Sequence, residues 1–199
     1  LWGLPQDAYA SSGLDDKMSP GSFGRLILSD AVAFRVSYTG KPPPREQMYW
    51  RGPVLWDFNG RTWTHGRTTL AILPQFTELA QPVNYSVTLE PHNKTWLFAL
   101  DVPDKISVPS RLSSDFQVLN KSPVTALLRY EARSYLGYHA NPNESQYQIQ
   151  RALQLPQPLN PRAQQLATQW RASSTDDAAV IRRALEYFVG EEGRHHEAG

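Results

Sequence analysis

The chain has 199 residues and a net charge of +1, with 20 Lys and Arg against 19 Asp and Glu, so it lacks the basic excess typical of a nucleic-acid-binding surface. Its length suits one domain, or one domain and part of another. It contains no cysteine, which excludes disulfide bonds and a catalytic thiol among these residues. No apolar run approaches the ~20 residues needed to cross a bilayer, so we expect a soluble segment.

The first part of the chain predicts an irregular lead-in followed by one strand. Residues 1–24 are rich in Gly, Ser, Pro and Asp, and we expect them to pack through Trp2. A strand is predicted over residues 26–39 because apolar and polar positions alternate there. The side that faces the core holds Val32, Phe34, Val36 and Tyr38.

The stretch 49–64 carries the strongest turn signal, Asn59-Gly60, because a type I′ turn needs positive φ at both central residues. A two-residue loop predicts three cross-strand pairs: Phe58 with Arg61, Asp57 with Thr62, and Trp56 with Trp63. The tryptophan pair would fix the register, and the Arg61 guanidinium would stack on one of its rings. We expect this hairpin to be the central element of an all-β region, with a bulge or an edge at Gly52-Pro53.

Further strands are predicted as far as residue 140. The clearest alternation covers 83–89, and the continuously apolar run 95–100 predicts a strand buried on both faces. A loop or a turn of helix is predicted over 74–82. The other predicted strands cover 67–73, 105–108, 115–119 and 124–136. Arg129, Glu131 and Arg133 lie on one face of the last strand, which we expect to be solvated.

After residue 140 the apolar spacing becomes helical. One short helix is predicted up to Leu155, and a second begins at Asn160-Pro161, an N-cap followed by a first-turn proline. A third follows Ser174 and Asp177, which resemble a capping box. Its apolar stripe holds Val180, Ile181, Ala184, Leu185 and Phe188. We therefore expect a β-rich domain at 1–140 and a helical segment at 141–199, with the last helix the least ordered element.

Three motifs resemble one known family. Tyr49-Trp50-Arg51-Gly52, followed by the run Phe58-Asn59-Gly60-Arg61-Thr62-Trp63, is similar to the signature of bacterial membrane-anchored transglutaminase-like proteins of the TgpA type. The segments 1–5, 18–21 and 28–36 resemble the same family, as do Leu153-Gln154-Leu155-Pro156 and Leu159-Asn160-Pro161-Arg162. The three motifs occur in the family's order, whereas residues 190–199 depart from it.

The resemblance implies a parent protein with several N-terminal membrane helices and a part on the periplasmic face of the bacterial inner membrane. That part would hold a leading β-rich domain and a papain-like transglutaminase core with a Cys-His-Asp triad. Residues 1–140 would be a non-catalytic antiparallel β-sandwich or barrel-like domain that supports or gates the core, whose first helices would lie at 141–199. Because this chain has no cysteine, no catalytic residue is assigned to it.

The residues that carry the signature are predicted to be structural: Trp50, Arg51, Trp56, Phe58, Gly60, Arg61 and Trp63. No cofactor or metal site is predicted, because among five histidines only the adjacent pair His195-His196 are close in sequence. An alternative function is a glycan- or peptide-binding module that uses Trp2 and Trp50 as an exposed aromatic surface. For Trp56, Trp63 and Trp96, strand positions favour core packing.

The expected partners follow from the same two hypotheses. The first is the transglutaminase core of the same chain, and the others are cell-envelope proteins or peptidoglycan. We expect no nucleic-acid partner, and membrane attachment only through the parent chain.

Overall fold

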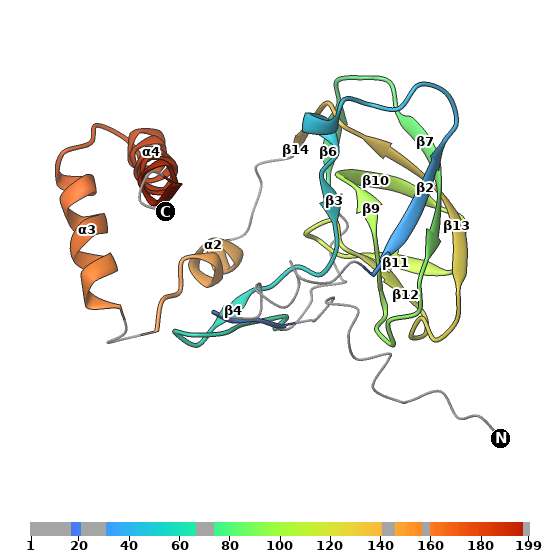
Figure 1. Ribbon diagram of the computed structural model, residues 1–199, viewed down its shortest axis with the longest axis horizontal. Coiled ribbons are helices and arrows are strands. Elements are labelled where there is room, and N and C mark those ends of the chain that lie inside the picture. Colours follow the sequence, from blue (N-terminus) through green and yellow to red (C-terminus); the bar gives the residue numbers. More distant parts are fainter. Residues whose placement is uncertain (1–16, 21–30, 67–73, 141–145, 157–159, 197–199) are drawn as a thin grey trace. The chain divides into compact units, whose positions relative to one another are not determined.

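The computed structural model describes residues 17–20, 31–66, 74–140, 146–156 and 160–196, with side chains as far as residue 190. The chain divides into two units, Leu1–Leu155 and Pro156–Gly199. Among the described elements, those of the first unit are mainly strands, and those of the second are all helices (Figure 1). The predicted fold class, mainly antiparallel β followed by two to three helices, is confirmed.

The largest sheet has four antiparallel strands in the order β10 (Val102–Ile106), β13 (Leu128–Tyr135), β7 (Val83–Leu89) and β2 (Phe34–Tyr38). The alternation predicted for 83–89 is confirmed, since Tyr85, Val87 and Leu89 are buried. Strand β2 also alternates, but it begins at Phe34, and Val32 is 49% exposed rather than in the core.

A second sheet packs its apolar residues against the first. It contains β11 (Ser110–Leu112), β12 (Val118–Asn120) and β8 (Trp96–Leu97), and the neighbouring β9 (Ala99–Leu100) pairs with β3 (Trp50–Arg51). Every residue from Trp96 to Leu100 is buried, as the continuously apolar run predicted. Since a buried Leu contributes about 1.5–3 kcal/mol to folding, this segment is the centre of the core. The hairpin at 57–64 does not occupy that place, contrary to expectation.

Two small sheets complete the strand-rich unit. One joins β1 (Lys17–Met18), β5 (Trp63–Thr64) and β4 (Asp57–Phe58), and the other joins β14 (Tyr138–Ala140) to β6 (Phe76–Glu78). The prediction of a loop or helical turn over 74–82 holds for residues 74–75 and 79–82 but is wrong for Phe76–Glu78, which form a strand with the Phe76 ring packed on Tyr135. A short 3-10 helix covers Arg45–Gln47. The predicted strand at 67–73 and residues 1–16 of the lead-in, which include Trp2, lie outside the described residues, whereas β1 lies within the segment predicted to be irregular.

The hairpin that contains Asn59-Gly60 has a different register from the predicted one. Phe58 pairs with Trp63 and Asp57 with Thr64, so the predicted Trp56–Trp63 pair is wrong. The Phe58 and Trp63 rings stack with centroids 4.7 Å apart and form the aromatic pair of this ribbon.

The Asn59 side chain explains the longer loop. Its Oδ1 accepts hydrogen bonds from the backbone N–H groups of Arg61 (3.0 Å) and Thr62 (2.8 Å). Only Gly60 of the central pair has a positive φ, +95°, so the turn is not type I′. An Asn side chain can close a turn in place of a backbone group, and here it does so over residues 59–62.

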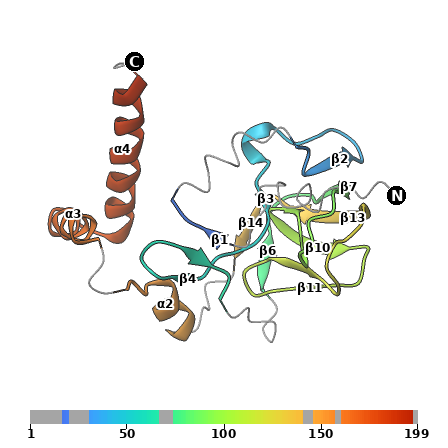
Figure 2. The same ribbon diagram turned by 60° about the horizontal axis from the view of Figure 1, so that its bottom comes forward.

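Three α-helices follow the strands: α2 (Gln146–Ala152), α3 (Pro161–Ala172) and α4 (Asp177–His196). In the second unit, α3 and α4 lie beside each other (Figure 2). The rings of Trp170 and Tyr187 join the two helices edge to face, with centroids 5.4 Å apart. None of the helices in the described part of the chain combines the length and apolar character needed to cross a membrane.

The helix starts differ from the predicted caps. Asn160 adopts a left-handed conformation and makes no side-chain cap, although its backbone carbonyl accepts the Gln164 N–H. At α4, Asp176 rather than Ser174 accepts the first free amide, from Ala179 at 2.8 Å. This bond lowers the pKa of Asp176, because it stabilises the carboxylate.

Candidate functional site

The motif Tyr49–Gly52 ties the β3–β9 ribbon to the main sheet. Trp50 lies across the core face of that sheet, with its ring 5.1 Å from Phe34 and 5.5 Å from Tyr85. Tyr85 is itself fixed, because its hydroxyl accepts the Leu100 N–H at 2.7 Å. Burial raises the pKa of Tyr85 to about 12, so it stays neutral. Trp50 is therefore a packing residue at this junction.

Arg51 holds the opposite side of the same ribbon. Its Nε donates to the Asp101 carbonyl at 3.1 Å, and its guanidinium is 3.4 Å from the Asp101 carboxylate. The Tyr138 hydroxyl donates to the same carboxylate at 3.0 Å. Burial, together with this neighbouring charge, raises the pKa of Tyr138. One arginine thus links β3, the turn after β9, and β14.

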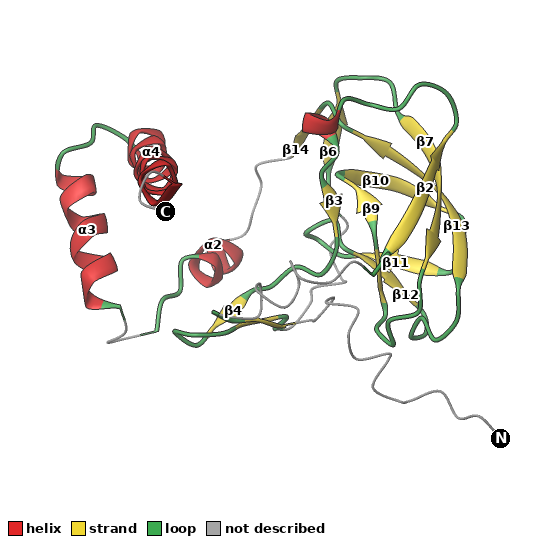
Figure 3. Cartoon of the chain, viewed as in Figure 1, coloured by secondary structure: helices red, strands yellow, loops and turns green. Residues whose placement is uncertain are grey.

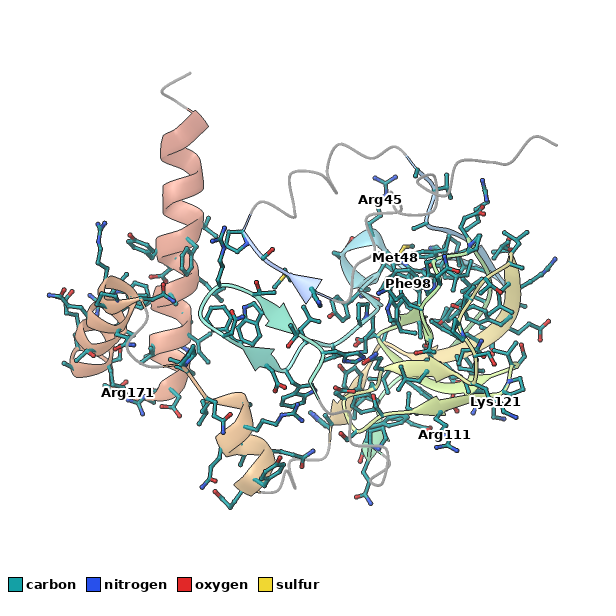
Figure 4. The ribbon with its side chains drawn as sticks, turned by 90° about the horizontal axis from the view of Figure 1, so that it is seen from below. Arg45, Met48, Phe98, Arg111, Lys121 and Arg171 are labelled. Atoms are coloured by element: carbon teal, nitrogen blue, oxygen red, sulfur yellow. The ribbon has the colours of Figure 1, made fainter. Side chains whose placement is uncertain are left out.

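Gly52 is required by a close approach. A Cβ atom added there would lie 2.9 Å from the ring of Phe98, which belongs to the core (Figure 4). The Phe98 ring is stacked 4.4 Å from Phe34, so it has little freedom to move away. Each residue of Trp50-Arg51-Gly52 therefore contributes differently to this junction. Trp50 packs its ring on the sheet, Arg51 pairs with Asp101, and Gly52 lacks the Cβ that would contact Phe98.

A second group of residues surrounds the signature residue Trp56, and we call it the Trp56 cluster: Trp56, His65, Ser113, Asp115, Gln117 and Arg151. The Trp56 indole N–H donates to the Asp115 carboxylate at 2.6 Å. The fully buried Ser113 hydroxyl donates to the other oxygen of that carboxylate. The Arg151 guanidinium lies 5.1 Å above the Trp56 ring and binds Asp57 at 3.0 Å, so α2 is attached to the hairpin.

The tautomer of His65 follows from its partner. The Gln117 side-chain oxygen accepts the Val54 N–H at 3.3 Å, so its amide nitrogen faces His65. An amide nitrogen only donates, and His65 Nε2 must therefore accept at 3.1 Å, which leaves the ring proton on Nδ1. Among the described residues, that Nδ1 has no hydrogen-bond partner.

The Trp56 cluster is not arranged for nucleophilic catalysis. A catalytic serine must be accessible to its substrate, but the Ser113 hydroxyl is turned into the fold, where it donates to the Asp115 carboxylate and accepts the Gln117 N–H. The His65 ring faces the Gln117 amide rather than Ser113. Ser113 and Gln117 are 0% exposed, so no substrate can reach them. In the described part of the chain, no three His, Asp or Glu residues gather as metal ligands would. What this cluster does is fix the hairpin and α2 to the β11–β12 turn.

Arg61 and the proposed aromatic ligand surface complete the residues singled out in the sequence. Arg61 is exposed, and the cation over Trp56 is Arg151, so the predicted Arg61 stack is wrong. The packing of Trp50 between Phe34 and Tyr85 supports a structural role. Trp2 lies outside the described residues, and a ligand surface that includes it stays a prediction.

Comparison with known proteins identifies the family of the strand-rich region. Residues 1–140 match the family model described as the TgpA N-terminal domain. The chain belongs to the TgpA family. It is 34% identical over 194 residues to the protein-glutamine gamma-glutamyltransferase of Pseudomonas aeruginosa, covering 94% of this chain and 28% of that protein. The fold is therefore that of a TgpA N-terminal domain.

Solved TgpA structures agree with this chain in fold. The periplasmic domain of Pseudomonas aeruginosa TgpA bound to ethylmercury superposes with a TM-score of 0.82 at 34% identity, over 88% of this chain and 63% of that one. A second crystal structure of the same domain gives 0.81 at 33% identity, over 88% of this chain and 61% of that one. This TgpA-family chain thus spans less than two thirds of each relative.

The partners of the signature residues were not visible in the sequence. Asp101, Asp115 and Arg151 complete the two networks, yet they lie 50, 59 and 94 residues from the groups they bind. Of these three residues, only Arg151 had a recognisable local setting in the sequence, because it lies in the short helix predicted up to Leu155. No periodicity or spacing connects residues so far apart, and the family resemblance alone marked Trp50, Arg51 and Trp56 as a set.

Proposed function

We propose that this chain is the leading periplasmic portion of a membrane-anchored transglutaminase-like acyltransferase. Residues 1–140 would support the catalytic core or restrict access to it, without taking part in the chemistry. The match to the TgpA N-terminal domain carries this proposal. The absence of cysteine from the chain and the full burial of Ser113 in the Trp56 cluster support a non-catalytic role.

In the proposed parent protein, the chemistry takes place on the core. A cysteine thiolate attacks the side-chain amide of a glutamine, ammonia leaves, and the acyl group passes to an amine or to water. The parent would be anchored in the bacterial inner membrane, and its core would be the first partner of this region. Other cell-envelope proteins and peptidoglycan are further proposed partners.

The helices α3 and α4 would form the start of that core. The outer side of α4 carries exposed apolar residues: Ile181 (59%), Leu185 (61%), Phe188 (62%) and Val189 (69%). A helix with such a stripe is stable when another element covers it. The solved relatives are longer, since this chain spans 63% and 61% of them, so their further residues would be candidates for that role.

Two assays test the non-catalytic role. The chain alone should not incorporate a fluorescent amine into a glutamine-bearing protein, whereas a longer protein that includes the following core should. Deleting residues 1–140 from the longer protein should lower its turnover or widen its substrate range. Full activity and unchanged selectivity of the deleted protein would refute the supporting role, as would transamidation by this chain alone.

A pair of variants tests the core assignment of α4. Ile181→Gln with Leu185→Gln should lower the Tm of the longer protein by several degrees, because two buried apolar side chains are lost there. The same change should leave the Tm of this chain almost unchanged. Arg182→Gln with Glu186→Gln, on the same helix, is the control and should be neutral in both. Equal effects of the two pairs in the longer protein would contradict the assignment.

A further inference from the structure

A groove of about 1030 Å³ lies on the strand-rich unit, along the four-stranded sheet and the connection between β10 and β11. Its lining includes Ser37, Asn84, Ser86, Lys105, Ser107 and Arg129. Sites for single small molecules enclose about 300–1,000 Å³, so this groove has room for several linked units of a polymer. It contains none of the signature residues discussed above.

The register of the sheet gives the groove a polar floor. Ser37 pairs with Ser86, which pairs with Glu131, and Asn84 pairs with Arg133 on the same sheet. Residues opposite each other in antiparallel strands share a face, so small hydroxyl and amide groups lie beside longer charged ones. These groups can donate to and accept from the backbone and side chains of an extended ligand.

The charges of the groove are unbalanced. Its lining has two more cations than anions. Arg133 is neutralised, because its Nε donates to Asp104 at 2.9 Å and 3.0 Å. Within the described residues, Lys105, Arg111 and Arg129 form no salt bridge. Lys121 lies near Arg111, on the strand-to-strand turn beyond β12, and adds to this positive field (Figure 4).

We propose that this groove binds an extended peptide segment rich in Asp and Glu. The unpaired cations would meet the carboxylates of the peptide, and the hydroxyl and amide groups of the floor would meet its backbone. A concave site with small side chains such as Ser37 and Ser86 opposite each other on its floor fits a narrow strand. This proposal concerns the strand-rich unit alone, and it stands whether or not the helices belong to a transglutaminase core.

Other anionic partners fit the groove less well. A bilayer surface is flat, and proteins that lie on it present apolar side chains, whereas Pro109 is the sole apolar residue among the exposed residues lining this groove. Sugar rings favour stacking on an open aromatic face. Of the two aromatic residues in the lining, Tyr85 is only 2% exposed.

Fluorescence anisotropy on the whole chain tests the proposal. The probe is a short fluorescein-labelled peptide of alternating Glu and Ser, and its counterpart carries Gln in place of each Glu. We expect the Glu peptide to bind, more weakly as salt rises, and the Gln peptide not to bind. The variant Lys105→Gln with Arg129→Gln should weaken binding about tenfold, since two exposed charge contacts contribute about 1.4 kcal/mol together.

The control variant is Lys41→Gln with Arg45→Gln. It removes the same number of exposed cations from outside the groove and should change affinity less than about twofold. Equal weakening by both variants would show attraction by net charge alone and overturn the site. Equal binding of the Glu and Gln peptides would overturn the acidic specificity. Preferential binding of phosphatidylglycerol vesicles or polygalacturonate at the same residues would overturn the peptide assignment.

Discussion

The two units of the chain differ in the solvent exposure of their apolar side chains. In the strand-rich unit, Val87, Leu97 and Leu100 are 0% exposed, and strands far apart in sequence cover them (Figure 3). In the helical unit, Ile181 and Leu185 are 59% and 61% exposed although they lie on a well-formed helix. Regular secondary structure therefore does not imply a completed core. The strand-rich unit contains the core that holds it together, and α4 presents a face that none of the described residues of its own unit covers.

The largest expected effect is the contrast between two leucines. Leu100→Ala should lower the free energy of unfolding by about 2–5 kcal/mol, because it leaves a cavity in a closed core. Leu185→Ala should change it by less than about 0.5 kcal/mol in this chain, because the side chain is already solvated. Urea unfolding followed by circular dichroism and tryptophan fluorescence measures both. If Leu185→Ala lowered the free energy of unfolding by more than about 1 kcal/mol, the Leu185 side chain would be buried against another element, because substitutions of solvated side chains cost less.

Two glycines sharpen the comparison. Gly52→Ala should destabilise the strand-rich unit by about 1–3 kcal/mol, because the new methyl group meets the packed Phe98 ring. Gly190→Ala on α4 has open space at the Cβ position and should be stabilising by about 0.5–1 kcal/mol, as Ala is in a helix. Thermal unfolding of the two variants gives the signs. A neutral Gly52→Ala would mean that the ribbon can move away from the core.

These contrasts also show what the sequence could predict. The alternation at 83–89 and the apolar run at 95–100 depend on neighbouring residues. The structure confirms the strand at 83–89 and the burial of Trp96–Leu100, although it divides the second run between β8 and β9 instead of forming one strand. The register at Asn59 depends on a side chain that accepts two backbone donors, which a residue count cannot reveal. The contact of Arg51 with Asp101 joins residues 50 positions apart, and only the tertiary structure brings them together. Local periodicity thus predicted individual strands, whereas the contacts that position them could be identified only from the tertiary structure.

The third prediction concerns the Trp56 cluster. The Trp56 N–H to Asp115 bond should show a coupling of about 1–2 kcal/mol in a double-mutant cycle of Trp56→Phe and Asp115→Asn, because bonds to charged groups exceed neutral ones. Urea unfolding of the four proteins measures it. A cycle of Trp56→Phe with Asp104→Asn is the control, since Asp104 binds Arg133 instead. Equal coupling in the two cycles would contradict a specific contact.

The smallest expected effect is a pH dependence from His92, which stacks on Trp96 at 4.2 Å and is 5% exposed. Burial, and then the Lys94 charge, lower the pKa of His92 below its value in the unfolded chain, about 6.5. The unfolded chain therefore binds the proton first as the pH falls. Stability should be full above pH ~6.5, fall below it, and level off below the folded-state pKa.

The variant His92→Phe separates this effect from other titrations. It keeps a ring on Trp96 but cannot bind a proton, so the fall in stability below pH ~6.5 should become shallower. His139→Asn, at an exposed position, is the control and should keep the original slope. Urea unfolding at a series of pH values gives the slopes. Because His92 packs against the same Trp96 that opens the buried run, an unchanged slope in His92→Phe would place the acid sensitivity outside this core and weaken the view that the strand-rich unit is closed around it.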